Sequence, residues 1–161
     1  MADVVDPLVR SRMMAGIRAK NTKPEIFVRS GLHKRGFRYR LHVRDLPGRP
    51  DIVLPKWKAV IFVHGCFWHA HNCELFKLPS TRRSWWRDKL ERNRFIDARS
   101  TSILVNSGWR VLTVYECAIK GRGRQHPEDL FDKIEAWLKS NKQTLGIRSK
   151  LSAQISRHKS Q

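Results

Sequence analysis

The segment from Gly48 to Cys73 reads GRPDIVLPKWKAVIFVHGCFWHAHNC, and it decides the expected fold. Two apolar runs, Asp51 to Leu54 and Ala59 to Val63, are joined by four residues, a connection short enough for a β-hairpin. The second run leads into a loop rich in Cys and His. A carboxylate at the start of a strand can hold a hard cation, and clustered Cys and His can hold a soft one. The segment therefore predicts strand pairing next to two kinds of metal chemistry.

The rest of the chain adds helices and further strands. Apolar spacing predicts helices over residues 8–20 and 22–36, and Thr22, Pro24 and Glu25 have the spacing of a capping box at the start of the second. A long helix is expected over 84–106, an amphipathic helix over 127–139, and further strands over 37–42 and 109–115. This order predicts one α/β domain over residues 1–140, with a central mixed sheet flanked by helices and an N-terminal helical arm at about 7–20.

The amino-acid composition limits the classes of molecule that the protein is expected to bind. The 161 residues include 33 Lys and Arg against 14 Asp and Glu, a net charge of +19, which favours nucleic acid over an anionic membrane surface as the partner. No apolar run approaches the ~20 residues of a membrane-spanning helix, and no signal-peptide core is visible. We therefore expect a cytoplasmic protein associated with the nucleoid. Residues 141–161 contain no acid and few large apolar residues, so we expect them to form a disordered basic tail.

A candidate soft-metal site comes from the Cys- and His-rich loop. Cys66, His71 and Cys73 lie in that loop, and Cys117 follows the strand expected over 109–115. Four N and S ligands make a closed structural zinc site, and zinc would cross-link a loop that has little aliphatic content. An odd number of cysteines argues against a disulfide framework. The alternative is simple burial of the thiols, and for Cys117 alone that is the better interpretation.

A second set of residues could hydrolyse a phosphodiester, which needs a cation, a base that activates water and a group that assists the leaving oxygen. Asp51, His64 and His69 supply such groups, and the carbonyl of Val63 could be a second oxygen ligand. Glu25 is a lone acid in a strongly basic segment, so it either caps its helix or reaches into a site. Each of these residues alone is more often structural, so the hypothesis depends on their coming together.

Aromatic residues beside basic ones are suited to contact with DNA. Phe67 and Trp68 lie between candidate zinc ligands, and Trp85 and Trp86 open the long helix amid arginines. Such rings can stack on bases or wedge between base steps while the basic groups hold phosphates. We expect one tryptophan of each pair to belong to the core instead. Core packing is also the more frequent role for a residue such as Met14.

Taken together, these motifs resemble those of the very-short-patch repair endonucleases. RSRMMAGIRAKNTKPE at 10–25, LPGRPDIV at 46–53, VIFVHGCFWHAHNC at 60–73 and GWRVLTVYEC at 108–117 occur in order and at near-constant spacing. FVHGCFWH after GRPD is the most specific match. The resemblance implies a restriction-endonuclease-like fold. It also implies an enzyme that nicks DNA 5′ of the T in a T:G mismatch arising from 5-methylcytosine deamination, which begins very short patch repair.

The resemblance also implies a role for individual residues. Asp51 and the carbonyl of Val63 would bind catalytic Mg²⁺. His69 would be the general base, oriented with Glu25, and His64 would act at the scissile phosphate or its hydrated metal. The structural Zn²⁺ would be held by Cys66, His71, Cys73 and Cys117, and the residues wedged into the duplex would be Phe67, Trp68, Trp86 and Met14.

The sequence departs from the family pattern at two positions. Val63 stands where Thr is expected, which matters little if only its carbonyl binds metal, and Ala70 interrupts a run that is histidine in other members. The Glu-x-Lys half of the usual nuclease motif is absent. Phe62 and His64 occupy that spacing, so the histidines must do work that a lysine does elsewhere.

Three functions remain to be distinguished. The first is a Mg²⁺-dependent, zinc-stabilised nicking enzyme that acts as a monomer on mismatched double-stranded DNA, with mismatch-repair proteins as candidate further partners. The second is a zinc-containing DNA-binding module without catalysis, although a pure binder has no use for acids that repel phosphate. The third is a dimeric restriction nuclease that cuts both strands. Aromatic residues that can wedge into the duplex favour the first function, because a mismatched base step costs less energy to unstack than a matched one.

Overall fold

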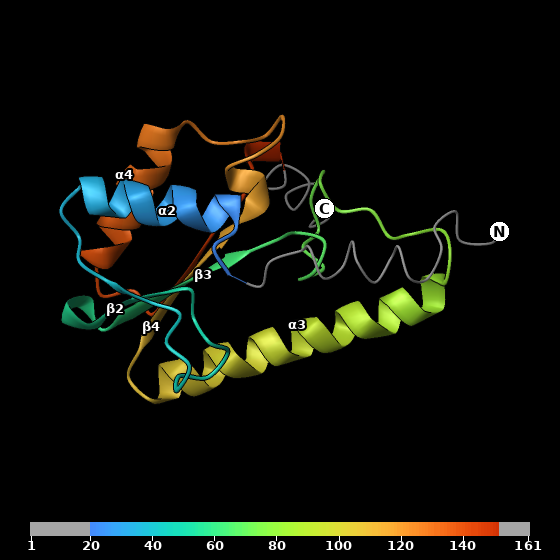
Figure 1. Cartoon of the computed structure of the whole chain (residues 1–161), viewed down its shortest axis with the longest axis horizontal. Coiled ribbons are helices and arrows are strands. Elements are labelled where there is room, and N and C mark those ends of the chain that lie inside the picture. Colours follow the sequence, from blue (N-terminus) through green and yellow to red (C-terminus); the bar gives the residue numbers. More distant parts are fainter. Residues whose placement is uncertain (1–19, 152–161) are drawn as a thin grey trace.

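A five-stranded sheet lies between two helices on one face and one long helix on the other (Figure 1) in the computed structural model, which describes residues 20–151. This confirms the α/β architecture with a mixed sheet. Residues 8–19 of the expected N-terminal helix lie outside the described range. The elements in chain order are α2 (Lys23–Lys34), β1 (Arg40–Leu41), β2 (Ile52–Leu54), β3 (Ala59–His64), α3 (Arg83–Asn106), β4 (Arg110–Tyr115), α4 (Pro127–Leu138) and β5 (Thr144–Ile147).

The sheet has the strand order β1-β2-β3-β4-β5. β2 and β3 form the predicted antiparallel hairpin, in which Ile52 pairs with Ile61 and Leu54 pairs with Ala59. Its turn is a 3-10 helix over Pro55–Trp57, followed by Lys58 in the left-handed region at φ 51°. β4 and β5 then run parallel to β3, so the carboxyl ends of these three strands meet at one edge.

Apolar side chains fill both faces of the sheet. Strand residues of one parity, such as Ile61 and Leu112, pack beneath α2 and α4 in the larger core. Residues of the other parity, such as Val60 and Val111, pack against Leu104 of α3 in a smaller one. Burial on both faces explains the near-continuous apolar runs of β2 and β3. Within residues 20–151, no helix combines the length and the apolar character needed to cross a membrane.

The expected disordered tail is wrong for its first part, because Thr144–Ile147 form β5. This strand pairs with β4 through Leu112–Leu145 and Val114–Ile147, and Ile147 is buried in the larger core. An edge strand with one packed face needs an apolar residue only at every second position. Leu145 and Ile147 meet that requirement within a segment that is otherwise polar, so average composition was misleading. The rest of the tail, residues 152–161, lies outside the described part.

Helix α2 is anchored at both ends. As predicted, the side chain of Thr22 caps its start by accepting a hydrogen bond from the Glu25 amide at 3.3 Å. Further along, Gly31 lies directly against the ring of Phe131 on α4, and a Cβ at this position would overlap that ring. The missing side chain therefore lets α2 and α4 approach closely, which fixes the position of Glu25 over the sheet.

Gly31→Ala should lower the free energy of unfolding by about 1–3 kcal/mol, as overpacking of a filled interior usually does. Urea denaturation measures the change. Ser30→Ala is the matched control, since Ser30 is exposed on the same helix and alanine favours helix there. If both variants are as stable as the unmodified protein, the close packing of α2 on α4 is not a constraint.

Candidate metal centre and nuclease site

The two site-bearing strands end side by side. β3 and β4 pair in parallel from Ala59–Arg110 to His64–Tyr115. Cys66 lies two residues beyond the end of β3, and Cys117 lies two residues beyond the end of β4. The strand register therefore brings together two cysteines that are 51 positions apart in the chain.

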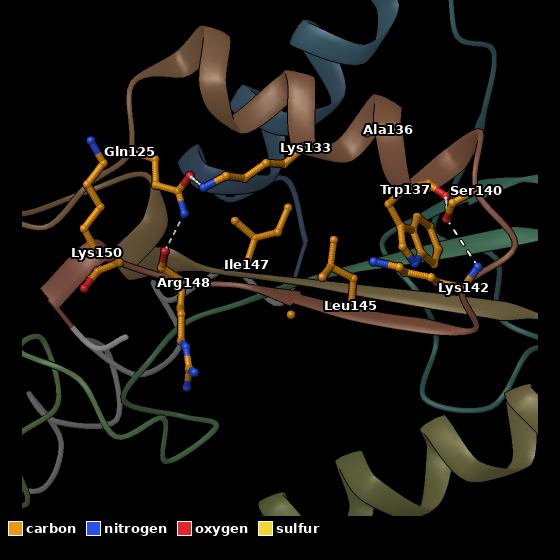
Figure 2. A pocket seen from close by; sticks show the side chains of 12 residues that line it. Gln125, Lys133, Ala136, Trp137, Ser140, Lys142, Leu145, Ile147, Arg148 and Lys150 are labelled. Atoms are coloured by element: carbon orange, nitrogen blue, oxygen red, sulfur yellow. Dashed lines mark hydrogen bonds between the residues drawn. The ribbon is translucent and has the colours of Figure 1, made fainter. Parts of the chain in front are cut away.

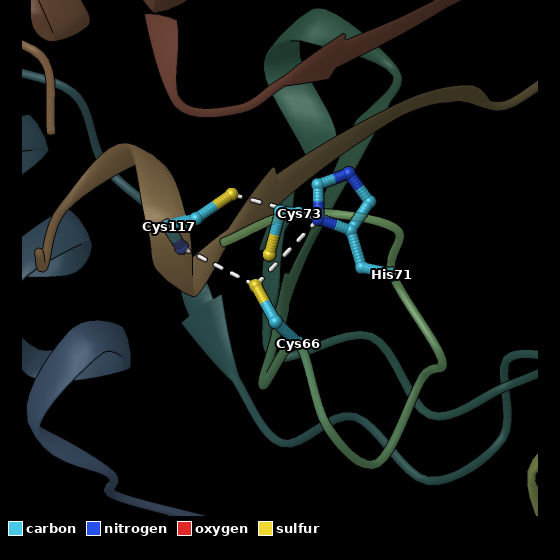
Figure 3. A group of neighbouring side chains, drawn as sticks. All are labelled: Cys66, His71, Cys73 and Cys117. Carbon is cyan, nitrogen blue, oxygen red and sulfur yellow. Dashed lines mark hydrogen bonds between the residues drawn. The ribbon is translucent and has the colours of Figure 1, made fainter. Parts of the chain in front are cut away.

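Three thiols and one imidazole converge at this edge (Figure 3). Nδ1 of His71 lies 3.6 Å from Sγ of Cys66 and 3.5 Å from Sγ of Cys117, and Cys73 completes a group whose ligand atoms all lie within 4.8 Å of one another. All three cysteines are buried and unpaired by disulfides. Backbone amides of Cys117 and Ser149 donate to Sγ of Cys66 and Sγ of Cys117, each at 3.3 Å.

This donor set fits a tetrahedral zinc ion. Zn–S bonds of about 2.3 Å and Zn–N bonds of about 2.0–2.1 Å place ligand atoms roughly 3.3–3.8 Å apart, close to the spacing of His71 from the two sulfurs. The thiols alone cannot all ionise. A hydrogen bond from Cys66 lowers the pKa of Cys117 to about 4, whereas that same contact raises the pKa of Cys66 and burial raises the pKa of Cys73. A divalent cation would stabilise all three thiolates together.

The loop between the ligands is a pair of tight turns. The amide of His71 donates to the Cys66 carbonyl at 2.9 Å, and the amide of His69 donates to the Gly65 carbonyl at 3.2 Å. The ring of His71 stacks on Tyr115 with a centroid distance of 3.8 Å. His69, two residues earlier, leaves the cysteine cluster and stacks on His64. The same loop thus serves both the metal centre and a second group of side chains.

That second group pairs two histidines with a carboxylate. The rings of His64 and His69 are parallel within 2° at a centroid distance of 3.6 Å, and Nδ1 of His69 lies 2.6 Å from Oδ2 of Asp97 on α3. The expectation that Glu25 orients His69 is therefore wrong, since Asp97 makes that contact. Because a carboxylate only accepts, Nδ1 carries the proton and Nε2 is left as the basic nitrogen.

His64 has a different character from His69. Burial, reinforced by the neighbouring His69, lowers the pKa of His64 to about 3, so its ring is neutral at pH 7. His69 keeps a partly exposed side chain. Both line a hollow of about 490 Å³ between α3 and the sheet, to which Arg94 and Tyr115 also contribute. A neutral ring and an oriented base thus face the same opening.

Two carboxylates face each other outside the lining of this hollow, one just before β2 and one on α2. Oδ2 of Asp51 accepts a hydrogen bond of 2.7 Å from the Val63 amide, one residue before His64. Burial raises the pKa of Asp51 to about 6, and the nearby negative charge of Glu25 raises it further, against the opposing effect of the Val63 amide. Two facing carboxylates form an oxygen donor set, which fits a hard cation such as Mg²⁺.

Glu25 contacts both the start of its helix and the neighbourhood of Asp51, the two alternatives that the sequence analysis left open. It is almost completely buried and accepts hydrogen bonds from Arg29 at 2.8 Å and from the Asn21 amide at 3.3 Å, while Nε2 of His42 lies 3.1 Å away. The Asn21 contact helps to cap α2. The carboxylate of Glu25 also lies close enough to Asp51 for its negative charge to raise the pKa of that residue.

The predicted wedge aromatics form one cluster. Ring centroids lie 5.1 Å apart for Phe67 and Trp68, 5.4 Å for Phe67 and Trp86, and 5.8 Å for Trp68 and Trp86. All three rings are half-buried, and Trp85 is exposed. The expectation that one tryptophan of each pair belongs to the core is therefore wrong. Met14 lies outside the described residues.

Sequence reasoning missed Asp97 and Tyr115. Nothing in the sequence of α3 distinguishes Asp97 from Asp88 or Glu91, and its role follows only from the place where the helix crosses the loop. Asn93 of the same helix donates to the Trp68 carbonyl at 2.9 Å, which holds that crossing in position. Tyr115 could have been inferred, because it is the last residue of a strand paired with β3.

The chain is similar in sequence to known proteins. A family model described as DNA mismatch endonuclease Vsr matches residues 2–75. The chain is 44% identical to the DNA mismatch endonuclease Vsr of Escherichia coli K12 over 86% of this chain and 88% of that protein. The chain belongs to the Vsr family of DNA mismatch endonucleases.

Two further relatives are named as nicking enzymes. The type II nicking enzyme V.XorIIP of Xanthomonas oryzae pv. oryzae is 48% identical over 76% of this chain and 90% of its own length. The type II nicking enzyme V.NmeAIP of Neisseria meningitidis is 39% identical over 76% of this chain and 87% of its own length. The family and the architecture together identify the fold as restriction-endonuclease-like.

Cys73→Ser should abolish tight zinc binding and destabilise the fold, because it removes one of four ligands from a buried cluster. A loss of roughly 3 kcal/mol would lower the melting temperature by about 6–12 °C for a chain of this size. Elemental analysis gives the zinc content, and calorimetry gives the melting temperature. Asn72→Ser, at the exposed neighbouring position, should leave both unchanged. Full zinc content in Cys73→Ser would remove Cys73 from the ligand set.

Proposed function

We propose that this protein is a Mg²⁺-dependent endonuclease that nicks one strand of duplex DNA 5′ of the T in a T:G mismatch. Such mismatches arise when 5-methylcytosine deaminates, and the nick would start very short patch repair. One observation carries the proposal: the hydrogen bond from the Val63 amide holds a partly buried carboxylate, Asp51, against the residue just before His64, whose ring stacks on His69. The names of the relatives, mismatch endonuclease and nicking enzymes, support the same reaction.

The cation would be held by Asp51 and the carbonyl of Val63, with Glu25 close by. Mg²⁺ bound there supplies charge neutralisation at the scissile phosphate. The oxygen donors and the raised pKa of Asp51 support this assignment, since a carboxylate pair gains stability from a cation. The zinc ion would be structural, because four protein ligands leave no open position for substrate.

His69 is the proposed general base. Its Nε2 would accept a proton from the attacking water, while Asp97 holds Nδ1 and stabilises the positive ring that results. Asp97 is thus a positioning residue. His64, kept neutral by burial, would donate a hydrogen bond to the phosphate as charge develops there.

Recognition of the mismatch would come from the aromatic cluster of Phe67, Trp68 and Trp86. A T:G step is cheaper to unstack than a matched step, so insertion of these rings favours the mismatch. Arginines on α3 and the net charge of +19 would hold the phosphates and position the protein without reading sequence. The half-exposed rings and the single copy of each site residue are consistent with action as a monomer.

A zinc-containing DNA-binding module without catalysis is less well supported. Asp51 and Glu25 would weaken binding to phosphate unless a cation lies between them and the DNA. An oriented His69–Asp97 pair also has no purpose in a simple binder.

The direct test is to incubate the protein with a labelled duplex that carries one T:G mismatch and with its matched T:A control, each with Mg²⁺ and with chelator. The proposal expects a single Mg²⁺-dependent nick 5′ of the mismatched T. Tight binding without cleavage in every sequence context tested would support the binding module instead. Cleavage of both strands of matched DNA would support a restriction nuclease.

Asp51→Asn should reduce nicking by at least about 10³-fold, because it removes the charge that holds the cation at the phosphate. Affinity for the mismatched duplex should change little, since phosphate contacts elsewhere dominate binding. Single-turnover cleavage and a filter-binding assay measure the two. Asp45→Asn, at an exposed position before β2, is the control. Normal nicking by Asp51→Asn would exclude this residue from the cation site.

Asp97→Asn should lower the nicking rate by about 10²–10⁴-fold, because the amide favours the wrong tautomer of His69. DNA affinity and melting temperature should stay close to those of the unmodified protein, which separates positioning from a structural role. Asp88→Asn on the exposed face of α3 should be neutral. Equal rates for the two variants would mean that Asp97 does not act through His69.

Trp68→Ala should reduce the preference for mismatched over matched duplex about tenfold or more, in line with the ~1–3 kcal/mol of one stacked base. Competition binding with the two duplexes measures this ratio. Phe95→Ala is the control, since Phe95 is exposed on α3 away from the aromatic cluster. An unchanged ratio in Trp68→Ala would make this ring a structural part of the loop.

A further inference from the structure

A groove of about 620 Å³ runs between α4 and β5, on the side of the sheet opposite α3 (Figure 2). Its floor is apolar, formed by Leu145 and Ile147 of β5 together with Ala136 and Trp137 of α4. The proposed nuclease site does not use it. We call this region, which is lined by residues 133–150 of α4, β5 and their connection together with Gln125, the β5 groove.

The β5 groove is bordered by an open strand edge. β5 is the last strand of the sheet, and in residues 20–151 its outer side pairs with no other strand. The Val111 amide donates to the Gln143 carbonyl, so alternate backbone groups, those of Thr144, Gly146 and Arg148, point outward. Gln125 already donates to the Arg148 carbonyl at 2.7 Å, as a neighbouring strand would. Thr144 and Gly146 are exposed, which leaves room for a strand beside them.

The groove also has one-sided charge. Lys133, Lys142 and Lys150 border it, and its described lining contains no acidic residue. Nζ of Lys133 donates a hydrogen bond to Oε1 of Gln125 at 2.6 Å. Because this partner is neutral, it leaves the positive charge of Lys133 uncompensated. An unopposed set of cations along an apolar floor is complementary to a chain that alternates acidic and apolar residues.

We propose that the β5 groove binds an extended acidic peptide segment of a partner protein, which adds to the sheet as a sixth strand beside β5. Backbone hydrogen bonds to the edge would supply affinity, and pockets for alternate side chains would supply specificity. Acidic side chains would meet the three lysines, while apolar ones would lie on Leu145 and Ile147.

The edge favours a peptide over the other occupants. A strand edge offers both N–H and C=O groups, which a peptide backbone satisfies together, whereas phosphates only accept and would face the carbonyls. The end of this chain is a poor match, because residues 152–161 carry Arg157 and Lys159 and no acid. A second copy would bring another lysine-lined edge against the first.

Fluorescence anisotropy with a labelled peptide that alternates Glu with Thr and Val tests the proposal on the full chain. The peptide should bind at least tenfold more tightly than its Lys-for-Glu counterpart. Lys142→Glu with Lys150→Glu should weaken binding at least tenfold. Lys120→Glu, exposed and outside the groove, should change it less than twofold. The double variant should still nick mismatched DNA at the unmodified rate.

Backbone pairing is tested separately from charge. Two acidic peptides are compared, one N-methylated at the odd residues and the other at the even residues, so that each has one edge blocked for hydrogen bonding. The peptide whose blocked edge faces β5 should lose binding, and the other should keep it. Hydrogen exchange at Thr144 and Gly146 should slow when the unmodified peptide binds. The proposal fails if both methylated peptides bind normally or the double variant binds unchanged. It also fails if oligothymidylate protects the same amides, or if the groove instead holds a dimer that the double variant disrupts.

Discussion

The parallel hydrogen-bond ladder between β3 and β4 is the constraint on which both sites depend. It places His64 opposite Tyr115, so that Cys66 and Cys117 leave the sheet side by side and the loop after β3 must return over the end of β4. His71 can then join the thiols and stack on Tyr115, while His69 is turned toward His64. A shift of one residue in this register would reverse the faces of the strand and separate both groups.

The second constraint is electrostatic. A chain with a net charge of +19 nevertheless gathers groups that can carry negative charge at two points, the thiols around His71 and the pair of Asp51 and Glu25. Arg29 compensates part of the charge on Glu25, whereas burial raises the pKa of Asp51 against the opposing effect of the Val63 amide. Bound cations would resolve both cases, one by closing a structural cross-link and the other, under the proposed function, by preparing the site for a phosphate.

The sequence allowed the local parts to be predicted and missed those that depend on packing between distant segments. Pro55 to Lys58 indicated the β2–β3 hairpin, and Thr22 indicated the start of α2, because turns and caps are set by neighbouring residues. The ligand set could be assembled from one loop and one strand end. Asp97 could not, since its contact with His69 depends on the angle at which α3 crosses the loop. β5 was missed because tertiary pairing can stabilise a strand that is polar on one face.

Helix α4 and strand β5 form the β5 groove, a proposed binding surface that is separate from the hollow containing the proposed histidine site. The hollow that contains the proposed histidine site borders β5 on the side facing α3, where Thr144 and Gly146 line it together with His64. The β5 groove uses the same strand on the side facing α4. Because the backbone of an added strand would lie in the plane of the sheet, it would extend the edge and send side chains into the β5 groove without filling the hollow on the α3 side. The amide of Ser149, just beyond β5, also donates to Sγ of Cys117. A partner strand bound along β5 would therefore pair with the segment whose next residues contact the metal centre. The β5 groove and the thiol cluster are thus connected through the backbone of residues 147–149 and the hydrogen bond from Ser149 to Cys117.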